Sequence, residues 1–146
     1  MVLDTTTKKI QALLAANVSN TQCSITVDYV EFTSSNTTPG LQLSVSNNTT
    51  AVDILSAPAS STQRKVNFIS IVNRDTDFVN LTVRLNDNGT LYNYISGMSV
   101  APNCTVQFTD TRGWSIIDST GDLLVASGAY SDIQIFLSNG TWYSLS

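Results

Sequence analysis

The fold is decided by residues 64–118, which read RKVNFISIVNRDTDFVNLTVRLNDNGTLYNYISGMSVAPNCTVQFTDTRGWSIID. Apolar and polar side chains alternate through several short runs of this stretch. The clearest run has apolar residues at Val79, Leu81, Val83 and Leu85 and polar residues between them. Alternation with a period of two predicts a β-strand that turns one face to a core and the other to water.

Neighbouring runs repeat this pattern. In the first, Val66, Phe68, Ser70 and Val72 are predicted to share one face, and in a later one Cys104, Val106 and Phe108 do the same. Residues 113–116 open one more strand. Between two runs lies Asp87-Asn88-Gly89, and Asn-Gly supplies the positive φ angles of a tight hairpin turn. Together these signals predict an all-β fold, an antiparallel β-sandwich that is jelly-roll-like.

The flanking residues extend the same architecture. We expect a polar N-terminal arm at 1–7, one β-sandwich domain at 8–127 and a C-terminal hairpin at 128–146. Residues 8–16 are assigned to a strand, although Ile10, Leu13 and Leu14 also fit helical spacing. Strands are predicted at 23–29, at 41–45 and at 51–55, with loops at 34–40 and 57–62. The C-terminal hairpin, with its turn at Ser138–Gly140, is either the last strand pair of the sandwich or an appendage that packs on a neighbour.

Composition excludes several classes of function. Only 12% of the residues are charged and the net charge is −4, while Ser, Thr and Asn make up about a third of the chain. Nucleic-acid binding needs clustered Lys or Arg, and no basic stripe exists. No apolar run approaches the length of a membrane span, and the N-terminal residues do not resemble a secretory signal, so we expect no membrane partner and cytoplasmic synthesis. The composition suits a neutral β-rich surface that meets other proteins.

Catalytic residue sets are scarce. The chain has no histidine, which removes the commonest general base and most zinc or iron sites. Glu31 is the one glutamate, so a pair of glutamates is impossible, although two Asp could still act as acid and base. Asp118-Ser119-Thr120-Gly121 superficially resembles an aspartic-protease motif, but we interpret it as a turn. We therefore predict a protein that is not an enzyme and has no catalytic residues.

We expect no metal and no cofactor. Asp75-Thr76-Asp77 and residues 86–89 could offer oxygen ligands to calcium, but neither has the spaced carboxylates and distal Glu of an EF-hand. The first is interpreted as a loop between strands and the second as a hairpin turn. Cys23 and Cys104 are expected to be buried and reduced.

Aromatic residues supply the candidate interface. Trp114 is assigned to the core, and Tyr92 and Tyr94 are equally compatible with core and interface. Our predicted interface residues lie on the C-terminal hairpin, which needs a partner surface: Phe136, Trp142 and Tyr143.

Several segments resemble a group of small all-β proteins encoded among the virion genes of tailed bacteriophages. The matching segments are 72–76, 79–85, 86–90, 102–110 and 112–117, and the similarity covers roughly Gln22 to Asp122. The C-terminal Phe136…Gly140-Thr141-Trp142 resembles segments of phage fibre-type proteins. The resemblance implies a structural component of the virion and leaves its location in the particle open.

From this resemblance we expect a capsid cement, or decoration, protein on the outer capsid surface. Its partners would be the major capsid protein and further copies of itself, with a homotrimer matching the local symmetry of a shell. The alternative is a tail- or head-fibre module whose partner is a host surface glycan or a tail protein.

Overall fold

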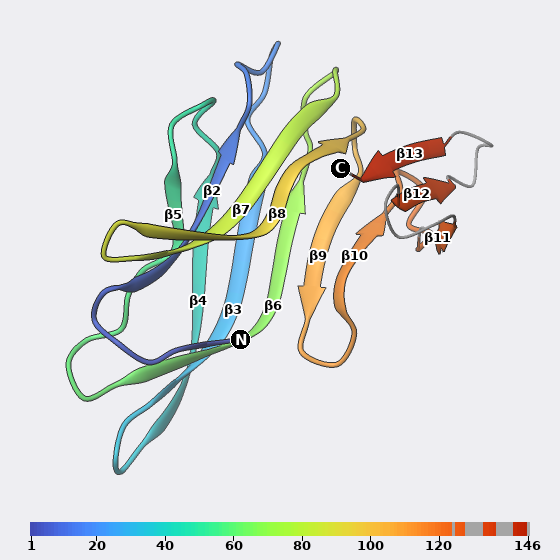
Figure 1. Ribbon diagram of the computed structural model, residues 1–146. Helices are drawn as coiled ribbons and strands as arrows, with labels where there is room; N and C mark the ends of the chain where they lie inside the picture. Colours follow the sequence, from blue (N-terminus) through green and yellow to red (C-terminus); the bar gives the residue numbers. More distant parts are fainter. Residues whose placement is uncertain (124, 128–132, 137–141, 146) are drawn as a thin grey trace.

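The computed structural model of the chain describes residues 1–123, 125–127, 133–136 and 142–145, and its described elements are all strands (Figure 1). The larger sheet has the order β10-β9-β6-β3-β4, with β1 paired to β6: β10 (Gly113–Ile117), β9 (Thr105–Thr109), β6 (Gln63–Val72), β3 (Ser24–Phe32), β4 (Thr37–Val45) and β1 (Val2–Leu3). The smaller sheet has the order β5 (Val52–Leu55), β2 (Lys8–Leu14), β7 (Val79–Asp87) and β8 (Thr90–Val100). Every neighbouring pair in both sheets is antiparallel.

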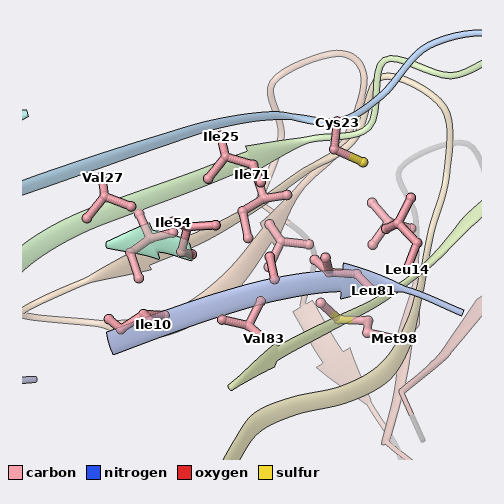
Figure 2. Close-up of a cluster of buried hydrophobic side chains, with 14 of the residues drawn as sticks. Ile10, Leu14, Cys23, Ile25, Val27, Ile54, Ile71, Leu81, Val83 and Met98 are labelled. Carbon is pink, nitrogen blue, oxygen red and sulfur yellow. The ribbon is translucent and has the colours of Figure 1, made fainter. Parts of the chain in front are cut away.

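The core lies between these two sheets. Both contribute fully buried aliphatic side chains, among them Ile25 and Ile71 from the larger sheet and Ile10 and Val83 from the smaller (Figure 2). Burying each such side chain contributes roughly 1.5–3 kcal/mol. The all-β class and the two antiparallel sheets of the predicted sandwich are confirmed, and the jelly-roll-like connectivity stays a prediction.

The hairpin between β7 and β8 forms as predicted. Asp87 and Thr90 are register partners, so Asn88 and Gly89 make a two-residue loop. Their φ angles are 50° and 93°, the left-handed values that a tight type I′ turn requires at both positions. The Asn-Gly dipeptide therefore sets the register of the β7–β8 pair from the turn to Arg84 and Asn93, beyond which the register shifts at bulges.

The predicted face of β6 is wrong beyond its first half. Val66 is buried, but the next buried residues are Ile69 and Ile71, while Phe68 and Val72 are only half-buried. The register explains the change, because Asp28 pairs with Phe68 and the next residue, Tyr29, pairs with Val66. The extra residue between them, Asn67, forms a β-bulge that shifts the alternation by one position.

The predicted N-terminal arm differs from the structure in its first residues. Val2 and Leu3 form β1 against β6, and the Leu3 side chain is completely buried. The buried Leu3 side chain and the backbone pairing with β6, including the Val66 N–H bond to the Met1 carbonyl at 2.9 Å, hold this segment on the sandwich. The predicted loop at 34–40 is also shorter, because the Thr33 N–H donates to the Asn36 carbonyl at 2.9 Å and β4 begins at Thr37. Residues 8–14 form a strand, as assigned.

The C-terminal residues form a third sheet of β11 (Val125–Ser127), β12 (Ile133–Phe136) and β13 (Trp142–Leu145), in that order. In the antiparallel pair β12–β13, Ile133 lies opposite Leu145. Strand β11 precedes the predicted boundary at 128 yet pairs with β12, so the division at that point separates two paired strands. The predicted turn at 138–140 lies outside the described residues.

Candidate interaction surface

Strand β4 exposes its apolar side chains and turns its polar ones inward. Leu41, Leu43 and Val45, which we call the β4 row, are 60%, 67% and 58% exposed, whereas Gln42 and Ser44 are half-buried. This arrangement is the reverse of the usual one for a strand at the border of a core, and contiguous exposed apolar side chains are typical of interaction sites.

Two contacts hold β4 in this orientation. The Gln42 amide donates to the Asp53 carbonyl at 3.0 Å, and its oxygen accepts from the Ser56 N–H at 3.0 Å, so Gln42 links β4 to the end of the smaller sheet. The Tyr29 ring covers Gly40, where a Cβ atom would come within 2.4 Å of the ring. Gly40 and Gln42 therefore lie on the inner face of the sheet, and Leu41, Leu43 and Val45 lie on the outer face.

The surface beside the β4 row carries the exposed Asp28 opposite Leu41 but is otherwise poor in charge. No charged residue occurs between Glu31 and Asp53 in the sequence. Across the sheet, the register continues from Leu43 through Thr26 and Ser70 to Gln107, all uncharged. The outer face of the larger sheet thus has an uncharged central row that ends at Leu43, and the exposed Asp28 lies in the next row, opposite Leu41.

The smaller sheet has a different outer face. There Lys9 pairs with Asp53 at 2.9 Å, and the Gln11 amide donates to the same carboxylate at 2.8 Å. Arg84 donates to the Gln11 oxygen at 3.3 Å. A face of mutually paired charged and polar groups is typical of a solvated surface, so the larger sheet offers the better candidate for protein contact.

Aromatic rings gather where β8 approaches β10. The Trp114 ring lies 5.3 Å from the Phe108 ring and 6.3 Å from the Tyr94 ring. Trp114 is half-buried and packs against the core, so its assignment to the core is corrected to the border of the core. Burial raises the pKa of Tyr94, with a smaller opposite effect from Lys8. Tyr92 is 56% exposed and Tyr94 is 37% exposed, so both rings reach solvent and Tyr94 is the more covered of the two.

The three predicted interface residues all belong to one strand pair. Phe136 lies opposite Trp142 in the β12–β13 register, and Tyr143 lies opposite Ile135. The backbone thus brings these positions together in the third sheet. Their side-chain environments are outside what the structure describes.

The candidate calcium loop is organised by hydrogen bonds instead. The buried Asp75 carboxylate accepts from the backbone N–H groups of Ser19 and Asn20 at 2.7 and 2.8 Å, and from that of Thr21 at 3.2 Å. Burial acts to raise the pKa of Asp75, but these N–H donors outweigh it and hold the pKa below its ordinary value of 3.8. The carboxylate therefore anchors the loop before β3 to the loop after β6.

The aspartic-protease-like segment is a turn, as interpreted. The Asp118 carboxylate accepts from the backbone N–H groups of Thr120 and Asp122, each at 2.9 Å. Within the described residues, no group of three His, Cys, Asp or Glu side chains is placed to hold a metal ion. Cys23 and Cys104 are buried and unpaired, and burial raises the pKa of both thiols.

A polar groove of about 360 Å³ lies among three loops, and sequence reasoning missed it. Its lining is rich in Ser and Thr hydroxyl groups and also includes a carboxylate, an aromatic ring, a methyl group and an amide: Asp4–Thr6, Phe32–Ser34 and Ala59–Gln63. Asp4 is paired with Lys8 at 2.6 Å, and this hydrogen bond lowers the pKa of Asp4. The groove has no second carboxylate, so it lacks the pair needed for acid–base chemistry.

Comparison with protein-family models, curated proteins and solved structures finds no match. Among the residues that the structure describes, no helix is long and apolar enough to cross a membrane.

Proposed function

We propose that this chain is a structural protein of a phage particle, with a jelly-roll-like sandwich that acts as a capsid cement protein on the outer shell. The resemblance of residues 22–122 to small virion proteins supports this proposal. Under this proposal the protein is a binding module without catalytic residues or cofactor. Its partners are the major capsid protein and further copies of itself, with which it forms a trimer.

The observation that carries the proposal is the β4 row, together with the uncharged row that continues from Leu43 across the outer face of the larger sheet. Leu41, Leu43 and Val45 leave more apolar surface in water than a strand at the edge of a small domain requires. The uncharged row from Leu43 to Gln107 can lie against a shell without the cost of desolvating a charge. Many such weak contacts, repeated over a lattice, stabilise a shell through effective concentration.

A charge placed in the middle of this face tests the proposal. Ser70→Lys should lower the number of copies retained on purified particles, because the ammonium group would have to lose its water at the interface. Thr90→Lys, an equal change of charge at an exposed position of the smaller sheet, is the control and should leave occupancy unchanged. Equal occupancy for both variants would exclude the outer face as the contact.

Particles that lack the protein give the functional readout. They should release DNA at lower temperature, or under milder osmotic shock, than complete particles, because the links between capsid subunits are missing. Counting subunits is a second readout, since hundreds of copies indicate shell decoration and a dozen or fewer indicate a tail or fibre position.

The C-terminal strands are expected to contribute to assembly. Deleting residues 131–146 removes Phe136, Trp142 and Tyr143 and leaves both sheets of the sandwich intact. The shortened chain should give the circular dichroism of a folded β protein but weaker oligomerisation or particle binding. A deletion variant that binds particles as well as the full chain would remove these residues from the interface.

A fibre module that binds a host glycan is the second candidate, favoured by the exposed Tyr92 ring beside Tyr94. Aromatic rings are common partners of sugar faces because they combine apolar area with a polar group. If particles lacking the protein are as robust as complete ones but fail to adsorb to host cells, the fibre function replaces the cement function.

A further inference from the structure

Strand β4 has one open edge. It pairs with β3 and forms no ladder with another strand in the described part of the chain (Figure 1). Two backbone hydrogen bonds, one at each end of the β3–β4 pair, show which residues of β4 form hydrogen-bonded pairs with β3. The Ser46 N–H donates to the Cys23 carbonyl at 3.0 Å, and the Thr33 N–H donates to the Asn36 carbonyl.

The alternation of these hydrogen-bonded pairs determines which backbone groups of β4 face away from β3. In an antiparallel pair, alternate residues direct their N–H and C=O groups to the partner strand and the residues between direct theirs away. Counting back from Ser46, the residues turned away from β3 are Val45, Leu43 and Leu41. The same three residues that expose aliphatic side chains thus also present their backbone groups at the open edge, and within the described residues no hydrogen bond to those groups is found.

The edge lacks the usual protection against strand addition. Natural edge strands carry charged residues, bulges or proline. Strand β4 has no charge, and its register with β3 is continuous from Thr37 to Val45. Its one protective residue is Pro39, near the beginning of the strand.

We propose that β4 pairs antiparallel with β4 of a second copy of this chain, about a twofold axis that passes through Leu43. In this register Leu43 lies opposite its own copy, and Leu41 lies opposite Val45. All three are hydrogen-bonded pairs, each exchanging two backbone bonds, so the contact forms about six N–H···O bonds. The two β4 rows merge into one aliphatic patch on the outer face.

A second copy fits this edge because the edge is self-complementary. A twofold contact brings the same surface patch together with itself, so like charges would face each other if the patch carried any. The sequence Leu-Gln-Leu-Ser-Val presents aliphatic side chains of similar size in both directions, without charge. Pro39 would lie opposite Asn47, beyond the end of β4 at Val45, and therefore does not interrupt the pairing.

This inference does not depend on the proposed function, because the twofold pairing takes place in the isolated protein, whereas the trimer proposed above is the form assembled on the shell. It is also compatible with a shell contact, because the pair forms through the strand edge and the outer face stays accessible. Failure of pairing in solution and failure of particle stabilisation are separate outcomes of separate experiments.

Disulfide crosslinking tests the register. Opposed Cα atoms of a hydrogen-bonded antiparallel pair are about 5.5 Å apart, a separation that a disulfide spans. Leu43→Cys should form a covalent dimer under mild oxidation, while the native Cys23 and Cys104 are buried and stay unpaired. Leu41→Cys and Val45→Cys should each fail to crosslink alone and should crosslink when the two variants are mixed.

Sedimentation tests the association itself. The native chain should sediment as a reversible dimer, and Leu43→Lys should raise the dimer dissociation constant at least tenfold, because two ammonium groups would meet at the axis. Leu91→Lys, at a 47% exposed position of β8, is the matched control and should leave association unchanged. A monomer at high concentration, an oligomer insensitive to Leu43→Lys, or absence of the Leu43→Cys crosslink would each overturn the proposal.

Discussion

Replacing Trp114 by alanine probes how the open side of the sandwich is closed. Trp114 lies on β10 and contacts the Phe108 ring on β9 and the Tyr94 ring on β8, so it joins the two sheets. A fully buried Trp changed to Ala costs about 3–5 kcal/mol. Because Trp114 is half-buried, roughly half of that cost applies, and it already includes the contacts with the two rings. We expect a loss of about 2 kcal/mol of unfolding free energy.

Urea unfolding at fixed protein concentration, followed by far-UV circular dichroism, measures this loss. Chains of this size have slopes of about 1–3 kcal/mol per molar urea, so the midpoint should fall by about 1–2 M. Trp114→Phe is the control, because a smaller ring retains part of both contacts, and it should cost about 1 kcal/mol.

A change below about 0.5 kcal/mol for Trp114→Ala would refute this reasoning, because surface substitutions fall in that range. The Tyr94–Trp114–Phe108 cluster would then contribute little to the sandwich. A stable Trp114→Ala variant that fails only in binding would assign the ring to an interface instead.

Three further predictions concern single positions. The pKa of Asp75 is lower in the folded chain than the unfolded-state value near 3.8, so its ionised form stabilises the fold above that value. This stability is lost as the pH falls through the folded-state pKa. Thermal midpoints measured from neutral pH to about pH 2 should therefore fall less with acid in Asp75→Asn than in the native chain. Gly40→Ala should cost about 1–3 kcal/mol because the new methyl group meets the Tyr29 ring, and a Tyr29→Leu background should reduce that cost in urea unfolding. Cys23 and Cys104 should resist alkylation until the chain unfolds, and a crosslink between them in non-reducing mass spectrometry would contradict this expectation.

The sequence predicts strands well where alternation is local. Val79, Leu81 and Val83 are buried as expected, since β7 lies in the middle of its sheet and no bulge interrupts its own alternation. The Asn88-Gly89 turn is equally readable, because its φ requirement is a property of two residues.

Alternation fails where a long-range contact shifts it. The bulge at Asn67 depends on the pairing of β6 with β3, and nothing within β6 marks it. Likewise, Leu3 is buried because β1 reaches β6, a contact between residues far apart in the chain.

The candidate surface could be predicted only in part. The strand at 41–45 is evident from its apolar residues, yet those residues indicate a buried face, because burial is the usual fate of alternating aliphatic side chains. The inward orientation of Gln42 depends on acceptor and donor groups near β5, which sequence does not place. For Phe136, Trp142 and Tyr143, sequence and backbone register agree on a strand pair, and their role at an interface stays a prediction.

The orientation of β4 bears on function because it conflicts with the pattern of its own sequence. Rotating the strand to bury Leu41 and Leu43 would expose Gln42 and break its hydrogen bonds to β5, and it would drive the Tyr29 ring away from Gly40. The inner-face contacts therefore hold three aliphatic side chains in water. Alternating aliphatic side chains are usually buried, and sites where neighbouring contacts keep such side chains exposed are typical of functional surfaces. A β4 in which Leu41, Leu43 and Val45 are all replaced by Thr keeps strand propensity and the inner contacts, so it should fold with unchanged stability and lose self-association, which sedimentation would show.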